Sequence, residues 1–330
     1  MLRGWFAFLA FVAVSCPVAV AEPVKLIFDT DMDSDCDDAG AMAMLHALAD
    51  RGEIEILATT VSSHHPWSAP CVDAINTYYG RPDLPIGVPH AAGKDRQGSR
   101  FARKIADSFP RDTPVGKEAP DAVQVLRRVL AAAPDQSVVF VTVGDLTNPR
   151  HLLESAGDEF SALDGRALVA AKVTQWVCMG SRYPADLDPN PWGNFKIDPE
   201  STVEAIENWP TPILFTGGGA FAQSVATGKS LEQLPSGHPV RRVYELYFNG
   251  PAQDRHSADQ IAVYVAARGH GAPWKQVTFG HNHIFPNGTH EWRTSLDNPQ
   301  HSYISALADE AKAKDVAAEF NRLMLGQSAP

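Results

Sequence analysis

Cysteine is scarce in this chain of 330 residues. Four are present, Cys16, Cys36, Cys71 and Cys178, and no two of them form a closely spaced pair. A zinc site built from thiolates needs such pairs, so the sequence excludes this class of site. We expect the last three cysteines to be free and buried.

Clusters of basic residues are also missing, and the largest are the pairs Arg127-Arg128 and Arg241-Arg242. The chain carries 28 lysines and arginines against 39 aspartates and glutamates, which gives a formal net charge of −11. Proteins that bind nucleic acids present a basic surface, so we exclude nucleic acid as a partner. Assembly with further copies of the chain (a homo-oligomer) is left open by the sequence.

No apolar run reaches the roughly 20 residues that a membrane-spanning helix needs. The run at the N-terminus extends from Trp5 to Val14, and Cys16 and Pro17 interrupt its continuation. We therefore expect no stable insertion into a membrane.

The N-terminal segment has the pattern of a secretory signal. Arg3 precedes the apolar run, and Ala19-Val20-Ala21 forms a small-residue cleavage site. We expect residues 1–21 to be removed on export to a periplasm or to the medium. Cleavage before Cys16, as in a lipoprotein, is the alternative.

Short apolar runs alternate with amphipathic segments from Pro23 to near the C-terminus. Their spacing predicts strands over residues 25–28, 54–61, 137–143, 174–179 and 212–216, and helices over 39–50, 122–133, 149–155, 199–207, 259–267 and 304–325. Strands that are apolar throughout, such as VVFVTV, are typical of parallel sheets covered on both faces. We predict a single α/β domain over residues 22–330, Rossmann-like, with a mostly parallel central sheet and helices on both faces. Residues 183–194 and 281–300 lack periodicity and are candidate binding loops.

Residues 25–44, KLIFDTDMDSDCDDAGAMAM, crowd six aspartates into the ten positions from Asp29 to Asp38. They follow a predicted buried strand, and open parallel sheets bind ligands at the carboxyl ends of their strands. Two carboxylates at roughly 4 Å repel by about 4 kcal/mol at an effective dielectric of about 20, so converging carboxylates need protons or a cation. Calcium, which takes about six to eight oxygen ligands, fits such a set, and magnesium is the alternative.

Other interpretations of this segment are weaker. An EF-hand loop that starts at Asp29 would need glycine where Ser34 stands and glutamate where Gly40 stands. A haloacid-dehalogenase phosphatase would use the first two aspartates as nucleophile and acid, but that family has threonine or valine at the position of Asp33. The remaining interpretation is that the aspartates are solvated loop and cap residues, which suits Asp33 and Asp35 but not all six.

The segment DTDMDSDCDDAGAMAML resembles the opening motif of the inosine-uridine preferring nucleoside hydrolase family, in its longer form DTDMGxDxDDAxA. Three further resemblances follow in the family's order. They are VTVGDLTNPRHLL at 141–153, VCMGS at 177–181 with WGNFKIDPES at 192–201, and HSADQIAVYVA at 256–266. Together they extend over residues 24–325, and four ordered motifs are far more specific than any single one.

The resemblance implies a calcium-dependent hydrolase of the N-glycosidic bond of ribonucleosides, with a small-molecule substrate. In that family the metal holds a water and the ribose diol, an aspartate takes a proton from the water, and the water attacks the anomeric carbon. By motif position, Asp31 corresponds to this general base and to a metal ligand. The other implied metal ligands are Asp38, the Val143 carbonyl and Asp259.

On the substrate side, Asp37 and Asn194 correspond to family residues that contact the ribose. His64 replaces the asparagine that follows the family's second strand, and Trp192 replaces the glutamate before the sugar-binding asparagine. His283 lies in a segment rich in histidine and tryptophan, and we expect it to contact the base or to cap the pocket. All five are therefore candidate substrate-binding residues.

Two further departures from the family concern the metal loop and the leaving group. Asp33 stands where the family has glycine, which adds a carboxylate and removes a residue free to adopt a positive φ. Ala258 stands where purine-preferring members have a histidine that protonates the departing base, so the acid for the leaving group is unassigned. Two alternatives follow: a hydrolase of a different ribosyl-like substrate, and a metal-dependent protein that binds a sugar or nucleoside without turnover.

Overall fold

A computed structural model describes residues 22–91, 98–184, 190–271, 273–295, 300–307 and 309–328. The secretory signal predicted over residues 1–21 lies outside the described residues. Within them, no helix combines the length and the apolar character that a membrane span requires. Cys36, Cys71 and Cys178 are free and buried, which confirms that part of the sequence analysis.

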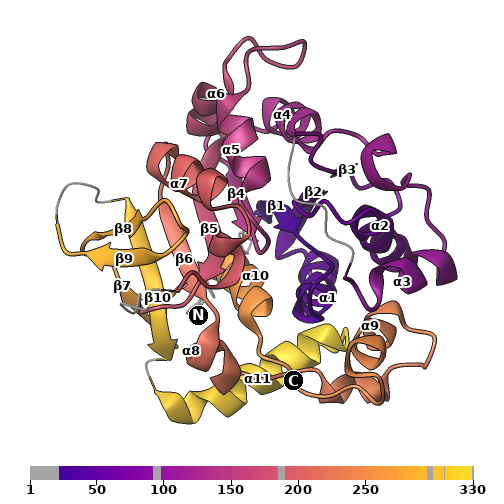
Figure 1. The fold of residues 1–330 in the computed structure, drawn as a ribbon. Helices are drawn as coiled ribbons and strands as arrows, with labels where there is room; N and C mark the ends of the chain where they lie inside the picture. The colour runs from indigo at the N-terminus through magenta and orange to yellow at the C-terminus, as the bar shows by residue number, and fades with distance from the viewer. Residues whose placement is uncertain are drawn as a thin grey trace, which may run out of the picture.

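The described residues form an eight-stranded sheet in the order β3-β2-β1-β4-β5-β6-β10-β7 (Figure 1). Neighbouring strands are parallel except β10 and β7, which are antiparallel, so the predicted mostly parallel α/β fold is confirmed. The strands are β1 (Val24–Thr30), β2 (Ile54–Val61), β3 (Ile86–Gly87), β4 (Val138–Thr142), β5 (Val173–Ser181), β6 (Ile213–Gly217), β7 (Trp274–Val277) and β10 (His301–Leu307). A separate hairpin consists of β8 (His281–Ile284) and β9 (His290–Arg293).

Helices cover both faces of the sheet (Figure 1). One layer contains α1 (Asp37–Asp50), α2 (Ser68–Tyr78), α3 (Ala102–Ser108), α8 (Gly219–Ser224), α9 (Pro239–Phe248), α10 (Ala258–Arg268) and α11 (Ala313–Met324). The other contains α4 (Ala122–Ala132), α5 (Thr147–Glu154), α6 (Gly165–Lys172) and α7 (Pro199–Asn208). Short 3₁₀ helices are η1 (Gly116–Glu118), η2 (Gly193–Lys196), η3 (Lys229–Gln233) and η4 (Glu310–Lys312).

The alternation of side chains along β1 explains why both faces are covered. Leu26 and Phe28 point into the core beneath α1, whereas Ile27 belongs to the core on the opposite face, together with Leu126 of α4. All four side chains are fully buried. A strand that is apolar on both faces stabilises the fold only between two helical layers.

Two predictions about the C-terminal part are wrong. Residues 304–307 belong to β10 instead of a helix, and the C-terminal helix α11 spans Ala313–Met324. These residues pair antiparallel with β7, with Leu307 opposite Trp274, so sheet pairing outweighs the local helical pattern. The segment 281–300 is also not simply a loop, because most of it forms the β8–β9 hairpin.

Candidate functional site

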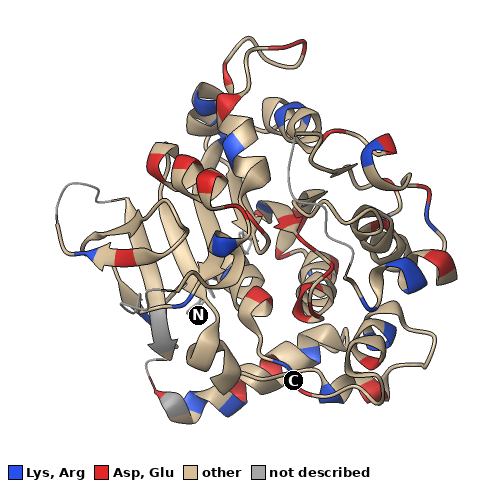
Figure 2. Cartoon of the chain, viewed as in Figure 1, with Lys and Arg blue, Asp and Glu red and all other residues tan. Residues whose placement is uncertain are grey.

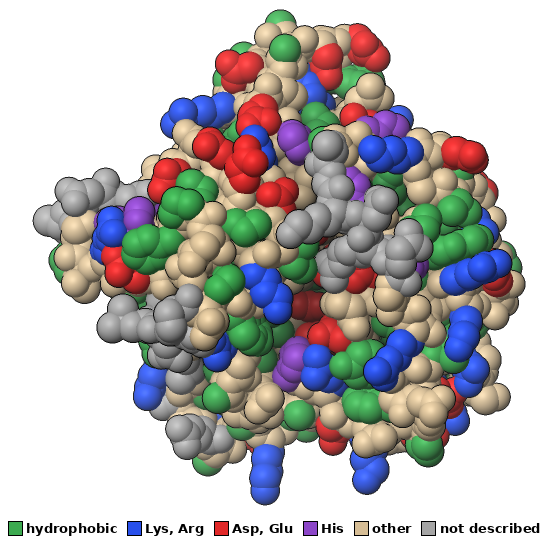
Figure 3. All heavy atoms as spheres, in the orientation of Figure 1, with side chains coloured by type: hydrophobic (Ala, Val, Ile, Leu, Met, Phe, Trp, Pro, Cys, Tyr) green, Lys and Arg blue, Asp and Glu red, His purple; other side chains and the backbone are tan. Residues whose placement is uncertain are grey.

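A cavity of about 720 Å³ opens at the carboxyl ends of the central strands, where the strand order reverses between β1 and β4. Figure 3 shows it as a hollow in which acidic side chains are visible. Its lining comes from the β1–α1 connection, the residue after β4, the end of β5, the segment 191–197 and the segment 255–259. The acidic segment after β1 therefore lies in the middle of the molecule (Figure 2).

Strand register places the first candidate residues side by side. Asp29 pairs with Thr142 across β1 and β4, so the chain leaves the sheet at Asp31 on one strand and at Val143 on the other. Asp31 is 3% exposed and Val143 is 2% exposed, and both line the cavity. Two residues that belong to different predicted motifs are thus brought together by the sheet.

A tight turn carries the chain from Asp31 into α1. Met32 is buried and has a φ of +38°, and its backbone N–H lies 3.3 Å from both Thr30 Oγ1 and Asp38 Oδ1. The Thr30 hydroxyl also donates to Asp38. The left-handed conformation therefore falls on Met32 and not on Asp33, the position where the related family has glycine.

Asp33 and Asp35 do not simply face water, which was one interpretation of the sequence. Asp33 is 4% exposed and accepts a hydrogen bond from the Ser63 hydroxyl. Asp35 Oδ2 lies 2.7 Å from Arg255 Nη2 in an ion pair. Of the two, only Asp35 lines the cavity.

Asp29 is buried behind the site and does not line the cavity. It accepts hydrogen bonds from Thr60 Oγ1 at 2.6 Å and from Asn148 Nδ2 at 2.7 Å, and Asn148 also donates to the Val61 carbonyl at 2.9 Å. Burial raises the pKa of Asp29 to about 7, although these hydrogen bonds act in the opposite direction. A phosphatase mechanism with Asp29 as nucleophile is not supported by this buried position.

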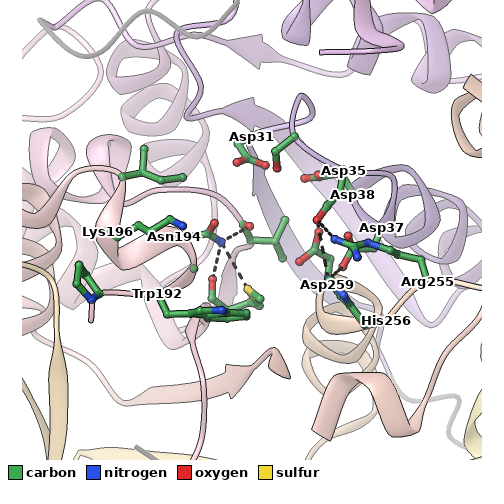
Figure 4. Close-up of a pocket in the computed structure, with 16 residues that line it drawn as sticks. Asp31, Asp35, Asp37, Asp38, Trp192, Asn194, Lys196, Arg255, His256 and Asp259 are labelled. Atoms are coloured by element: carbon green, nitrogen blue, oxygen red, sulfur yellow. Dashed lines mark hydrogen bonds and ion pairs between the residues drawn. The ribbon is translucent and has the colours of Figure 1, made fainter. Parts of the chain in front are cut away.

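Four nearly buried carboxylates converge on the cavity, those of Asp31, Asp37, Asp38 and Asp259, with exposures of 3, 2, 1 and 5%. Asp259 enters on α10, far along the chain, and Figure 4 shows it beside the aspartates of the β1–α1 segment, on the same side of the cavity. Burial, and next the repulsion between neighbouring carboxylates, raises the pKa of Asp37, Asp38 and Asp259 well above the usual value. Such a group is stable at neutral pH only with protons or with a cation.

The donor set fits a hard divalent cation. Asp37 Oδ1 is buried and has no hydrogen-bond partner among the described residues, which leaves a carboxylate oxygen unsatisfied. The available ligand atoms are carboxylate oxygens together with the Val143 carbonyl, and calcium and magnesium prefer oxygen ligands.

The segment 191–197 forms the opposite wall. Phe195 is fully buried and anchors the segment against Gly180, where a Cβ atom would overlap its ring. Asn194 Nδ2 donates to the Val143 carbonyl at 2.5 Å and to the Met179 carbonyl at 3.1 Å. Trp192, Asn194 and Lys196 line the cavity on this side (Figure 4).

Trp192 is held between two neighbours. It packs so closely on Gly218 that a Cβ atom there would overlap the indole, and the Arg182 guanidinium lies 5.3 Å from the centre of its ring. An immobilised aromatic ring in the lining is a suitable surface for the flat face of a ligand.

Arg255 and His256 line the cavity, although no role was predicted for either residue from the sequence. Backbone hydrogen bonds of 2.9 Å in both directions between Thr227 and Arg255 fix this segment. His256 Nε2 lies 3.4 Å from Asp37 Oδ2 and 3.9 Å from Asp35 Oδ2. One ligand atom from each of Asp35, Asp37 and His256 lies within 4.8 Å of the others, which is close enough to hold a metal ion.

The pKa values of Asp35 and His256 are lowered, whereas the pKa of Asp37 is raised. Burial acts to raise the pKa of Asp35, but a hydrogen bond with Asp37 and the charge of Arg255 outweigh it and hold the pKa below its usual range. Burial lowers the pKa of His256, and Arg255 lowers it further. Asp35 is therefore a carboxylate compensated by Arg255, unlike its neighbours.

Two predicted substrate-binding residues lie outside the lining. His64 follows β2 and does not line the cavity. His283 lies on β8, where its ring is 4.9 Å from that of Phe285 and its Nδ1 is 4.0 Å from Glu207 Oε1. Neither histidine is part of the cavity lining, and their roles stay predictions.

Gly144 follows Val143 and permits the close approach of the strand ends. A Cβ atom at this position would overlap Ser62 Oγ and lie 2.8 Å from the Asp31 backbone nitrogen. We expect Gly144→Ala to lower the free energy of unfolding by about 1–3 kcal/mol, because a packed interior resists an added methyl group, and to weaken metal binding by displacing Asp31.

Urea unfolding and calcium calorimetry check this expectation. Gly237→Ala is the matched control, because a Cβ atom there would meet nothing within 4 Å. Equal stability and calcium affinity in the two variants would contradict the steric argument.

Comparison with known proteins gives matches to solved structures only: no model of a known protein family matches the chain, and no curated protein does. A plant nucleoside hydrolase matches with a TM-score of 0.65 at 18% identity, over 93% of this chain and 100% of that chain. An inosine-uridine preferring nucleoside hydrolase from Bacillus anthracis matches with a TM-score of 0.65 at 15% identity, over 91% of this chain and 99% of the other. The type III effector protein XopQ, solved in complex with adenosine diphosphate ribose, matches with a TM-score of 0.67 at 14% identity, over 92% and 94%.

The chain therefore has the fold of the nucleoside hydrolases, along almost its whole described length. This agrees with the family resemblance that the four ordered motifs carry. At these identities the likeness establishes the fold.

Proposed function

We propose that the protein is a metal-dependent hydrolase of the N-glycosidic bond of ribonucleosides and that its metal is calcium. The observation that carries the proposal is the convergence of Asp31, Asp38, Asp259 and the Val143 carbonyl on one cavity in the fold of nucleoside hydrolases. None of these residues is near all the others in sequence, so the arrangement is a property of the fold.

The four groups just named would hold the cation. When bound, it supplies a positive charge that orients the ribose hydroxyls and makes a water molecule more acidic. Calcium suits carboxylate and carbonyl oxygens in a flexible arrangement, and magnesium is the alternative. Export, predicted from residues 1–21, would expose the site to the calcium outside the cell.

The side chains of the site can carry out the remaining steps. Asp31 is positioned to accept the proton of the attacking water, and the surrounding carboxylates stabilise the positive charge that develops on the ribosyl ring. Asp37 and Asn194 would bind ribose hydroxyls from opposite walls of the cavity. The two N–H groups of Asn194 already donate to the Val143 and Met179 carbonyls, which leaves Oδ1 as an acceptor for a ribose hydroxyl.

A second class of substrate is also compatible with the site. XopQ was solved with adenosine diphosphate ribose, which is a ribosyl compound but not a simple nucleoside. The alternative to nucleoside hydrolysis is thus a reaction on another ribosyl compound, or binding of such a compound without turnover.

Purified protein tests the proposal with inosine, uridine, adenosine and a nitrophenyl riboside. We expect release of base or nitrophenol that stops with a chelator and returns when calcium is added. The nitrophenyl riboside should react fastest, because nitrophenolate departs without protonation and Ala258 cannot supply a proton. Ribose binding without release from any of the four compounds would favour the binding protein over the hydrolase.

A further inference from the structure

Lys196 is a cation in the lining of an acidic cavity (Figure 4). Within the part of the chain that the structure describes, its side chain makes no ion pair and no hydrogen bond. Arg255, the other lysine or arginine of the lining, is neutralised by Asp35 at 2.7 Å. Lys196 therefore has a positive charge that no ion pair with a described residue compensates.

The charges of the cavity lie on different walls. The carboxylates of the β1–α1 segment and Asp259 lie on one side, and Lys196 projects from the opposite wall with Asn194 and Trp192 (Figure 4). Figure 3 shows basic side chains at both edges of the hollow. A substrate that spans the cavity would meet carboxylates, or the cation they hold, at one end and a positive charge at the other.

The position of Lys196 relative to the proposed ribose contact is fixed. Phe195 lies between Asn194 and Lys196 in the sequence, and its buried ring against Gly180 immobilises the short helix η2. Lys196 is thus held two residues from the amide that would accept a ribose hydroxyl. Lys196 is exposed, and its flexible four-carbon stem would allow the ammonium group to reach a substituent of that ribose.

We propose that the substrate is a ribosyl compound that carries a phosphate group and that Lys196 binds this phosphate. This inference rests on the proposed function, because it assumes a ribosyl group at Asn194 and Asp37. Lysine binds phosphate as a point charge, with charge-assisted hydrogen bonds. A neutral nucleoside would leave the lysine without a partner, whereas a phosphorylated one would compensate its charge.

Calorimetry with ribose and ribose 5-phosphate, both in the presence of calcium, tests binding without turnover. We expect wild-type protein to bind ribose 5-phosphate at least about tenfold more tightly than ribose. In Lys196→Ala the ratio of the two affinities should fall to about one, and in Lys196→Glu it should reverse. Lys314→Ala, an exposed lysine on α11, is the matched control and should keep the wild-type ratio.

Kinetics on inosine and inosine 5′-monophosphate separate this inference from the proposed function. A higher kcat/KM for the monophosphate, lost in Lys196→Ala, supports both. Cleavage of inosine without any preference for ribose 5-phosphate would overturn the phosphate inference alone. Cleavage of neither compound would overturn the hydrolase, while the affinity ratio would still decide whether Lys196 binds phosphate.

Discussion

Replacement of Asp31 by asparagine is expected to lower kcat for nucleoside hydrolysis by about 10²- to 10⁴-fold, the usual contribution of a positioned general base. Asparagine has nearly the same shape, so the buried turn at Met32 should remain intact. It has no carboxylate oxygen that can accept a proton from water. Because Asp31 is also a candidate metal ligand, the assay must be run at saturating calcium, where a lower calcium affinity no longer limits the rate.

Asp33→Asn is the matched control for this experiment. Asp33 is in the same segment and is equally buried, but it accepts a hydrogen bond from Ser63 and does not line the cavity. An asparagine oxygen can accept the same bond, so this variant should keep most of its activity. Similar kcat values for Asp31→Asn and wild type at saturating calcium would remove Asp31 as the base.

Much of the fold could be predicted from the sequence because its parallel strands are apolar throughout. Residues 54–61 and 138–142 read as strands with little ambiguity, since helices cover both of their faces. Residues 304–307 of β10 were mistaken for the start of a helix, since their pairing with β7 depends on a segment about 30 residues earlier in the chain. Local pattern carries no information about such a partner.

The candidate site was predictable where family motifs fix the spacing, as for Asp31, Asp38 and Asp259. Arg255 and His256 could not be placed in this way, because their position depends on the backbone pairing with Thr227 and on the packing of α10 against α1. A histidine three residues before a candidate ligand was visible in the sequence. Only the tertiary structure determines whether the side chain of His256 reaches the cavity.

The two candidate histidines, His64 and His283, lie outside the cavity lining. His283 was chosen for its residue type in a segment rich in histidine and tryptophan, but residue type says what a side chain can do and not where it lies. His64 was chosen by motif position, as the replacement for the asparagine that follows the family's second strand. The β8–β9 hairpin carries His283 next to Phe285 and away from α1 (Figure 1).

Asp259→Asn is expected to change stability in opposite directions with and without calcium. Asp259 is 5% exposed and faces other carboxylates, and burial and their repulsion raise its pKa. A carboxyl whose folded-state pKa is raised costs stability once the pH exceeds its unfolded-state value, so at pH 8 without metal the neutral asparagine should be the more stable by about 1–3 kcal/mol.

With calcium the order should reverse. Calcium at about one hundred times its Kd stabilises the wild type by about 2.7 kcal/mol, and a variant that lacks one carboxylate ligand should gain much less. Urea unfolding with chelator and with calcium measures both effects, and Asp83→Asn, at an exposed position, should follow the wild type in both. An aspartate that only supports the fold would lower stability in both conditions when replaced, so the reversal is the specific sign of a metal ligand. Equal stabilisation of Asp259→Asn and wild type by calcium would place the ion elsewhere.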